Sequence, residues 1–259
     1  MTSISLKGRR ALVLGGSKGI GRGIAEAFHA AGAKVIVTSR DADVAMTAAK
    51  EIGRGVKGLA LDTANFKQVD KVHARANTLL GGIDILVLNS GGPPPGGAVG
   101  VASDVWEAQW KGMVVGLLRM ADHAIPGMKE RGFGRIMIVS SSGVLQPIPN
   151  LAISNTIRPA LVGWSKSASN ELGGHGITSN VLAPGRIQTG RIEQLDAANA
   201  KRTGKSLAEV KADSVSKIPV GRLGTPAEFG AIATMLASDA GGYVTGSVIR
   251  IDGGAIAGV

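Results

Sequence analysis

The sequence has no cysteine, and Tyr243 is the only tyrosine among its 259 residues, of which 3% are aromatic. Without cysteine, disulfide scaffolds, thiolate metal sites and cysteine nucleophiles are excluded. With one tyrosine, phenol chemistry has a single place to occur. No apolar run approaches the roughly 20 residues of a membrane span, and residues 1–7 lack the apolar core of a signal peptide. We therefore expect a soluble, cytoplasmic protein without a metal centre.

Acidic residues are also scarce, with 19 against 29 basic residues and a net charge of +10. A basic balance invites a nucleic-acid hypothesis, but adjacent basic pairs occur only at Arg9-Arg10 and Lys201-Arg202. Aromatic residues rarely accompany them, so the pattern of a nucleic-acid surface is missing. A scattered basic surface instead favours anionic small ligands. We expect a small-molecule substrate, with neither nucleic acid nor membrane as a partner.

Glycine is abundant, at 39 residues, and 44% of the chain is hydrophobic, which is typical of a globular protein. Short runs rich in Val, Ile and Leu alternate with longer helical patterns, and neither a repeat nor a linker interrupts them. Such alternation predicts a single-domain Rossmann-type α/β fold over 1–259: a doubly wound parallel sheet of about seven strands with helices on both faces. The expected strands, which we take to be buried on both faces, are 10–14, 34–38, 56–61, 83–88, 135–139, 179–183 and 248–251. The expected helices are 19–31, 42–53, 65–80, 103–130, 155–173 and 226–238.

Two segments break this alternation. The proline-rich segment 91–97 predicts a stiff, extended loop after the fourth strand. The polar segment 190–217 contains a capping box, Ser206 to Glu209, that opens a short helix. Ligands of α/β sheets bind beyond the carboxyl ends of the strands, so we interpret 190–217 as a lid over the substrate. An ordinary surface insertion is the alternative.

A glycine-rich turn directly follows the first expected strand and opens a helix. Its pattern is G-x-x-x-G-x-G, a longer loop than the commonest dinucleotide fingerprint. Glycines at such a turn let the backbone approach a pyrophosphate at the helix N-terminus. The cofactor-binding residues predicted here are Gly15, Ser17, Lys18, Gly19, Ile20 and Gly21.

The second, third and fourth strands end in further polar residues that suit a dinucleotide. The second ends at Ser39-Arg40, with no carboxylate for the ribose hydroxyls of NAD. Arg40 and Lys18 favour a 2′-phosphate, so we expect NADP(H) over NAD(H). The third strand ends at Asp62-Thr63, whose carboxylate suits the adenine amino group, and Asn89 and Gly91 follow the fourth.

These motifs resemble the short-chain dehydrogenase/reductase family over about residues 7–254, and its β-ketoacyl-carrier-protein reductases in particular. Leu14-Gly15 to Gly21 resembles the family's T-G-x-x-x-G-I-G, and residues 88–91 resemble its N-N-A-G. Residues 180–189 match N-x-x-x-P-G-x-x-x-T. The resemblance implies that Pro184, Gly185, Ile187 and Thr189 lie along the nicotinamide.

The resemblance also implies an atypical active site. The family's Asn–Ser–Tyr–Lys tetrad falls on Met113, Ser141, Ser154 and Arg158. Serine is a far weaker acid than tyrosine, and arginine releases no proton near neutrality. Ser141, Ser154 and Arg158 are the catalytic candidates, and Arg158 is also a candidate for binding the cofactor ribose. Tyr243 precedes the last strand and cannot replace the missing phenol.

Two functions remain open at this stage. One is an NADP(H)-dependent oxidoreductase that reduces a carbonyl or conjugated small molecule without the usual Tyr/Lys pair. The other is a non-catalytic NADP(H)-binding sensor or subunit. The family resemblance also implies a homodimer or homotetramer formed through the helices 103–130 and 155–173. Trp110, Leu117, Leu118 and Trp164 are candidates for apolar surface in this contact, and packing in the core is the alternative for the same side chains.

Overall fold

The computed structural model describes residues 4–258, which form one seven-stranded parallel sheet in the order β3-β2-β1-β4-β5-β6-β7. The strand order reverses at β1. From there β2 and β3 follow toward one edge of the sheet, whereas β4 to β7 follow toward the other edge. The predicted doubly wound Rossmann-type sheet is thereby confirmed. The strands are β1 (Arg10–Val13), β2 (Lys34–Ser39), β3 (Lys57–Ala60), β4 (Ile85–Leu88), β5 (Gly134–Val139), β6 (Ile177–Pro184) and β7 (Val248–Ile251).

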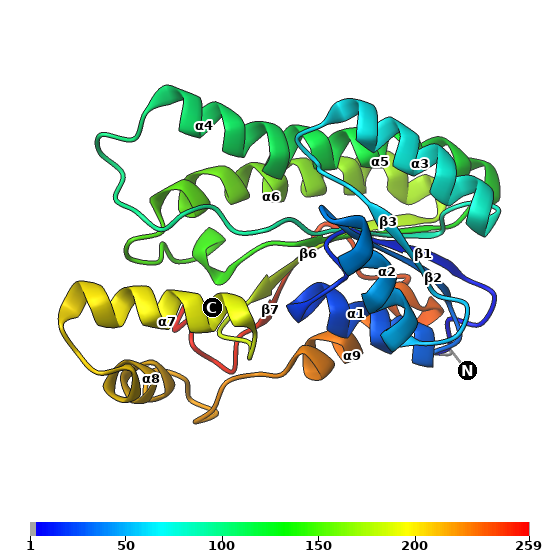
Figure 1. Ribbon diagram of the computed structural model, residues 1–259. Helices are drawn as coiled ribbons and strands as arrows, with labels where there is room; N and C mark the ends of the chain where they lie inside the picture. Colours follow the sequence, from blue (N-terminus) through cyan, green and yellow to red (C-terminus); the bar gives the residue numbers. More distant parts are fainter. Residues whose placement is uncertain (1–3, 259) are drawn as a thin grey trace.

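Helices cover both faces of this sheet (Figure 1). One face carries α1 (Gly19–Ala30), α2 (Ala42–Ile52) and α9 (Pro226–Ala237); the other carries α3 (Phe66–Leu80), α4 (Ser103–Trp110), α5 (Gly116–Arg131) and α6 (Ala152–Leu172). Helices α7 (Gly190–Thr203) and α8 (Leu207–Val215) lie to one side, beyond the sheet. Among residues 4–258, no helix combines the length and apolar character needed to cross a bilayer.

Strand side chains alternate between two hydrophobic clusters, one on each face of the sheet. In β1, Leu12 packs in the cluster with α3, α5 and α6, whereas Val13 packs with α1 and α9. Successive side chains of a strand point to opposite faces, so a strand covered on both faces buries nearly all of its side chains. The apolar runs of β1 and β4 follow from this arrangement, whereas β6 buries the polar residues Thr178, Ser179 and Asn180.

Three expectations about these elements are wrong in detail. The edge strands β3 and β7 are only partly buried, since each has one neighbouring strand. The single helix expected over 103–130 is divided by a π-helical turn, η1 (Lys111–Val115). The segment 190–217 is mostly helical, because α7 precedes the predicted capping-box helix, which is observed as α8.

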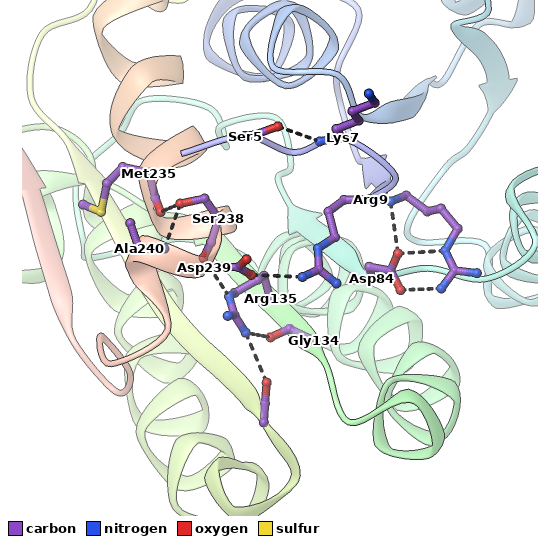
Figure 2. Close-up of polar contacts among 12 residues, drawn as sticks. Ser5, Lys7, Arg9, Asp84, Gly134, Arg135, Met235, Ser238, Asp239 and Ala240 are labelled. Atoms are coloured by element: carbon purple, nitrogen blue, oxygen red, sulfur yellow. Dashed lines mark hydrogen bonds and ion pairs between the residues drawn. The ribbon is translucent and has the colours of Figure 1, made fainter. Parts of the chain in front are cut away.

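Polar side chains secure the sheet at the amino ends of its strands (Figure 2). Arg10 binds Asp84 through two hydrogen bonds, Nε to Oδ2 at 2.7 Å and Nη2 to Oδ1 at 2.6 Å. Arg9 pairs with Asp239 at 2.9 Å, and its guanidinium lies 3.5 Å from the centre of the Phe133 ring. Figure 2 shows Arg9 directed toward Asp239 and Asp84 bound by a neighbouring arginine. They connect the amino ends of β1, β4 and β5 with the short helix η4 (Asp239–Gly241) that follows α9, and leave the carboxyl ends of the strands for ligands.

Candidate functional site

The strand order of the sheet reverses between β1 and β4, which lie side by side with their carboxyl ends at the same edge. Connections diverge on either side of such a point, so a crevice forms outside the strand ends, and dinucleotides bind there in folds of this kind. The glycine loop follows β1, and Asn89 to Gly91 follow β4. The topology therefore brings these two predicted segments together.

Direct hydrogen bonds fix the glycine loop in this crevice. Asn89 donates from Nδ2 to the carbonyl oxygens of Leu14 (3.1 Å) and Gly15 (3.2 Å). The Gly15 amide donates to Oγ1 of Thr38, at the end of β2, over 3.1 Å. Gly15 and Gly19 have φ of 58° and 56°, the left-handed region that favours glycine. A Cβ on Gly21 would lie 2.3 Å from the Gly15 oxygen, so helix α1 starts unusually close to the loop.

The rest of the loop suits an anionic ligand. Ser17 is buried and Ile20 is half-buried, whereas Lys18 is exposed. Arg40, directly after Ser39 at the end of β2, is exposed as well. Within residues 4–258, neither cation forms an ion pair with a carboxylate. These cations and the turn of small residues fit the phosphates of NADP(H).

Asp62 lies in a turn after β3 that leaves part of its carboxylate available. Oδ1 accepts from the Ala64 amide at 2.9 Å, while Oδ2 makes no hydrogen bond within residues 4–258. Thr63 contacts the neighbouring helical layer, since a Cβ on Gly116 would lie 1.8 Å from the Thr63 oxygen. The half-buried Asp62 can thus accept from an adenine amino group at the edge of the crevice.

The segment after β6 crosses the crevice in an extended form. β6 ends at Pro184, and a Cβ on Gly185 would lie 2.7 Å from Cα of Asp252, so only glycine fits. Ile187 forms an isolated parallel bridge with Gly224, and Thr189 comes close to the glycine loop. A Cβ on Gly19 would lie 3.2 Å from Cγ2 of Thr189. The predicted nicotinamide segment therefore faces the predicted pyrophosphate loop.

The three catalytic candidates lie around the end of β5. Ser141 begins the turn η2 (Ser142–Val144), and its Oγ accepts from the Gly143 amide at 3.1 Å. Ser154 and Arg158 lie one turn apart on α6, which packs against η2. Both are 7% exposed, and within residues 4–258 the Ser154 side chain has no hydrogen-bond partner. Its hydroxyl is therefore available to a ligand.

Arg158 is the most unusual charge in the site. Its Nη1 donates to the Val139 oxygen over 3.1 Å, and no carboxylate within residues 4–258 pairs with it. Burial, with a smaller contribution from the nearby charge of Arg191, lowers the pKa of Arg158 to about 10. It still carries its charge at neutral pH. An uncompensated buried cation costs stability, so its presence is best explained by a ligand.

Met113, the fourth position of the resemblance, lies inside the π-helical turn η1 and is 4% exposed. A π-turn leaves the ordinary helical hydrogen-bond pattern and is frequent near functional sites. A thioether provides no hydrogen-bond donor, so Met113 contributes packing there. Tyr243 is fully exposed and precedes β7, at the opposite end of the sheet from this crevice.

A cavity of about 340 Å³ adjoins the site beneath α7 and α8. Arg186 lines it and forms an ion pair with Asp196 of α7, whose side chain is 4% exposed. The buried Nε of Arg186 has no hydrogen-bond partner within residues 4–258. Arg186, Asp196 and Arg191 were not predicted as site residues; the available signal was that Arg186 lies within the motif 180–189 and that Arg191 and Asp196 follow this motif closely. No cluster of potential metal ligands occurs in residues 4–258.

Comparison with protein families gives one match along nearly the whole chain. The model described as enoyl-(acyl carrier protein) reductase, a short-chain dehydrogenase model, matches residues 15–255. The 3-oxoacyl-(acyl-carrier-protein) reductase FabG of Vibrio harveyi is 31% identical over 253 residues, covering 97% of this chain and 98% of that protein. The expected resemblance to β-ketoacyl-carrier-protein reductases is confirmed.

Two solved structures extend the similarity to the fold. L-sorbose reductase from Gluconobacter frateurii, complexed with NADPH and L-sorbose, has a TM-score of 0.93 and 29% identity, covering 99% of both chains. The 3-ketoacyl-(acyl-carrier-protein) reductase of Brucella melitensis, complexed with NADH, has a TM-score of 0.87 and 31% identity, covering 97% of this chain and 99% of the other. Both share the overall fold of this chain.

Proposed function

The chain belongs to the short-chain dehydrogenase/reductase family and is an oxidoreductase; from this premise, we propose that it uses NADP(H) to reduce a carbonyl or conjugated small molecule without a tyrosine acid. The observation that carries the proposal is that Ser154 and Arg158 are buried on α6, which packs against η2 directly after Ser141, and that Arg158 donates to the Val139 oxygen at the end of β5. These are the positions that the resemblance assigns to the catalytic tyrosine and lysine.

The cofactor preference rests on charge at the end of β2. Arg40 stands where an acid would bind ribose hydroxyls, and Lys18 and Arg40 have no carboxylate partner within residues 4–258. The similar structures include one complex with NADPH and one with NADH, so this chain's own cations favour NADP(H). Arg40→Ala should weaken NADPH binding about 10- to 100-fold and leave NADH unchanged. Arg54→Ala, at an exposed arginine between α2 and β3, is the matched control.

The protein's own residues position the substrate and stabilise charge. A bound nicotinamide supplies the hydride. Ser141 and Ser154 donate hydrogen bonds to the substrate oxygen, and Arg158 stabilises the negative charge that develops on it. Neither serine is acidic enough to be an efficient proton donor at neutral pH, and Arg158 retains its proton. Water therefore delivers the proton that completes the alcohol or the saturated product. An activated carbonyl or a conjugated alkene suits such a site, because its reduced intermediate carries a delocalised or stabilised charge.

The test combines cofactor binding with turnover. Calorimetry with NADPH is expected to show tight binding, and a panel of activated ketones and conjugated enones is expected to oxidise NADPH. Binding without turnover on the whole panel would favour the alternative, a non-catalytic NADP(H) sensor or subunit. Absence of NADPH binding would contradict both functions.

Self-association is part of the same proposal. Trp110, at the end of α4, is 44% exposed, and Trp164 of α6 lines a groove with Ile125 and Pro126 of α5. Leu117 cannot contribute, because it is 1% exposed and belongs to the core. We expect a homodimer or homotetramer through α4 to α6. Light scattering of the purified protein tests this expectation, and Trp110→Glu should shift the mass toward the monomer.

A further inference from the structure

Two arginines of the crevice are held by backbone oxygens rather than by acids. Arg158 donates to the oxygen of Val139, the last residue of β5, and Arg191 donates from Nη2 to the oxygen of Pro93 over 2.7 Å. Pro93 belongs to the loop after β4, which neighbours β5 in the sheet. Within residues 4–258, no carboxylate lies within 4.0 Å of either guanidinium.

The two cations come from different helices. Arg158 lies on α6, whereas Arg191 is the second residue of α7, two residues after Thr189. Arg191 lies directly over Gly92, where a Cβ would be 3.0 Å from its Nε. The two backbone acceptors follow neighbouring strands, since Val139 ends β5 and Pro93 lies in the loop after β4. Burial, and to a smaller extent the charge of Arg191, lowers the pKa of Arg158, and burial lowers the pKa of Arg191. Two cations that enter one crevice without acid partners repel each other, and an anion between them would remove that repulsion.

Resting on the function proposed above, we propose that Arg158 and Arg191 together bind a carboxylate of the substrate, which makes oxo acids and conjugated unsaturated acids the preferred substrate class. Guanidinium groups bind carboxylates with paired, charge-assisted hydrogen bonds, and this geometry is specific as well as strong. Because Arg158 is one helical turn from Ser154, the carboxylate lies next to the reacting carbon. A 2-oxo acid or a 4-oxo-2-enoic acid has this short separation.

The surroundings of Arg158 and Arg191 also favour a negatively charged ligand. The cavity under α7 and α8 is lined by four basic residues and two acidic ones: Arg186, Arg202, Lys205, Lys217, Asp196 and Asp213. Both acids pair with lining residues, Asp196 with Arg186 and Asp213 with Lys217. Arg202 and Lys205 therefore remain without a carboxylate partner within residues 4–258. The approach to the crevice is therefore electropositive, and an anionic substrate is attracted along it.

The diphosphate of the cofactor is the competing anion, since Arg191 is also near the glycine loop through Thr189. A substrate carboxylate and the cofactor diphosphate predict different effects of replacing Arg191. If Arg191 binds the substrate, its loss discriminates between a carboxylic acid and the corresponding neutral ester. If Arg191 binds the cofactor, its loss weakens NADP⁺ binding and affects acid and ester equally.

The experiment compares 2-oxobutanoate with methyl 2-oxobutanoate on the full-length protein. Turnover with NADPH is measured for both, and binding of 2-oxobutanoate to the NADP⁺ complex is measured by calorimetry. We expect kcat/KM to be at least about 10-fold higher for the acid. Arg191→Gln should abolish this preference, weaken 2-oxobutanoate binding about 10- to 100-fold and leave the ester and the NADP⁺ affinity within a factor of about two. Arg75→Gln, which removes the same charge from an exposed position of α3, should match the parent protein.

Each remaining outcome has a definite meaning. Equal use of acid and ester by the parent protein overturns the inference, as does an Arg191→Gln protein whose NADP⁺ affinity falls in parallel with its activity. Binding of 2-oxobutanoate that depends on Arg191, without turnover of any substrate, supports the anion site and contradicts the proposed reductase. Turnover of neutral ketones alone supports the reductase and contradicts the anion site.

Discussion

The side-chain amide of Asn89 holds the backbone of Gly15 in place: Nδ2 lies 3.2 Å from the Gly15 oxygen and would lie 2.8 Å from a Cβ at that position. One side chain from the end of β4 thus fixes the loop that follows β1. The contact leaves space only for a glycine at position 15. It connects β1 and β4, the two strands between which the strand order reverses.

We expect Asn89→Ala to weaken NADPH binding about 10-fold and to lower the free energy of unfolding by about 1–2 kcal/mol, because the two carbonyl groups of the loop lose their donor. Calorimetry and urea denaturation measure the two effects. Asn170→Ala, at an exposed residue of α6, should change neither. Normal NADPH affinity in Asn89→Ala would contradict the assigned role of this contact.

Replacing either of two buried arginines by a neutral residue should change the free energy of unfolding, in opposite directions for the two positions. Arg158 has one backbone acceptor, whereas Arg135 donates to the oxygens of Gly134 and Gly176 and stacks 4.2 Å from the Phe133 ring centre. Removing an uncompensated charge stabilises the fold, so Arg158→Met should raise the free energy of unfolding of the ligand-free protein by about 1–3 kcal/mol while reducing activity. Arg135→Met should lower the free energy of unfolding, because the oxygens of Gly134 and Gly176 lose their donor. Urea denaturation of both variants provides the comparison, and destabilisation of Arg158→Met would mean that Arg158 is structural.

The Asp84 carboxylate should determine much of the acid sensitivity of the protein. Burial alone would raise its pKa, but hydrogen bonds and charge from Arg10, with Arg131 nearby, hold the pKa of Asp84 below its usual 3.8. Its stabilising effect is therefore complete above pH 4 and is lost as the pH falls through the lowered folded-state pKa. Asp84→Asn should cost about 3 kcal/mol at pH 7 and flatten the pH dependence of stability below pH 4.

The measurement for Asp84 is urea denaturation from pH 2.5 to 7. Asp104→Asn, at an exposed position in the first turn of α4, is the control and should retain the parent profile. A steep acid transition that persists in Asp84→Asn would assign the sensitivity to other carboxylates.

Two helical glycines should have opposite responses to alanine. Gly230 of α9 packs directly on α1, where a Cβ would lie 2.4 Å from the Gly23 oxygen. Gly163 of α6 has nothing within 4 Å of that position. Gly230→Ala should destabilise the fold by about 1–3 kcal/mol, because the helices must separate. Gly163→Ala should stabilise it by up to about 1 kcal/mol through helix propensity, and thermal unfolding distinguishes the two.

Local patterns were sufficient to predict most elements of this fold. The apolar runs of β1 and β4 reflect the helices that cover both of their faces, and the Ser206 capping box forms where predicted. The division at η1 had no comparable signal, since residues 111–115 are compatible with an ordinary helix. There the close approach of Gly116 to the Thr63 oxygen, a contact distant in sequence, accompanies the change in helix geometry.

The sequence by itself determined the family, because its motifs depend on residue type and spacing along the chain, and it led to the proposals for the nucleotide loop and for Ser154 and Arg158. Only the tertiary structure decided that Arg158 is buried with no acid partner among residues 4–258 and that Arg191, 33 positions later in the chain, is held by the Pro93 oxygen in the loop after β4. Spacing cannot reveal the dielectric environment of a charge or its distant neighbours, since both arise when separate strands and helices pack together.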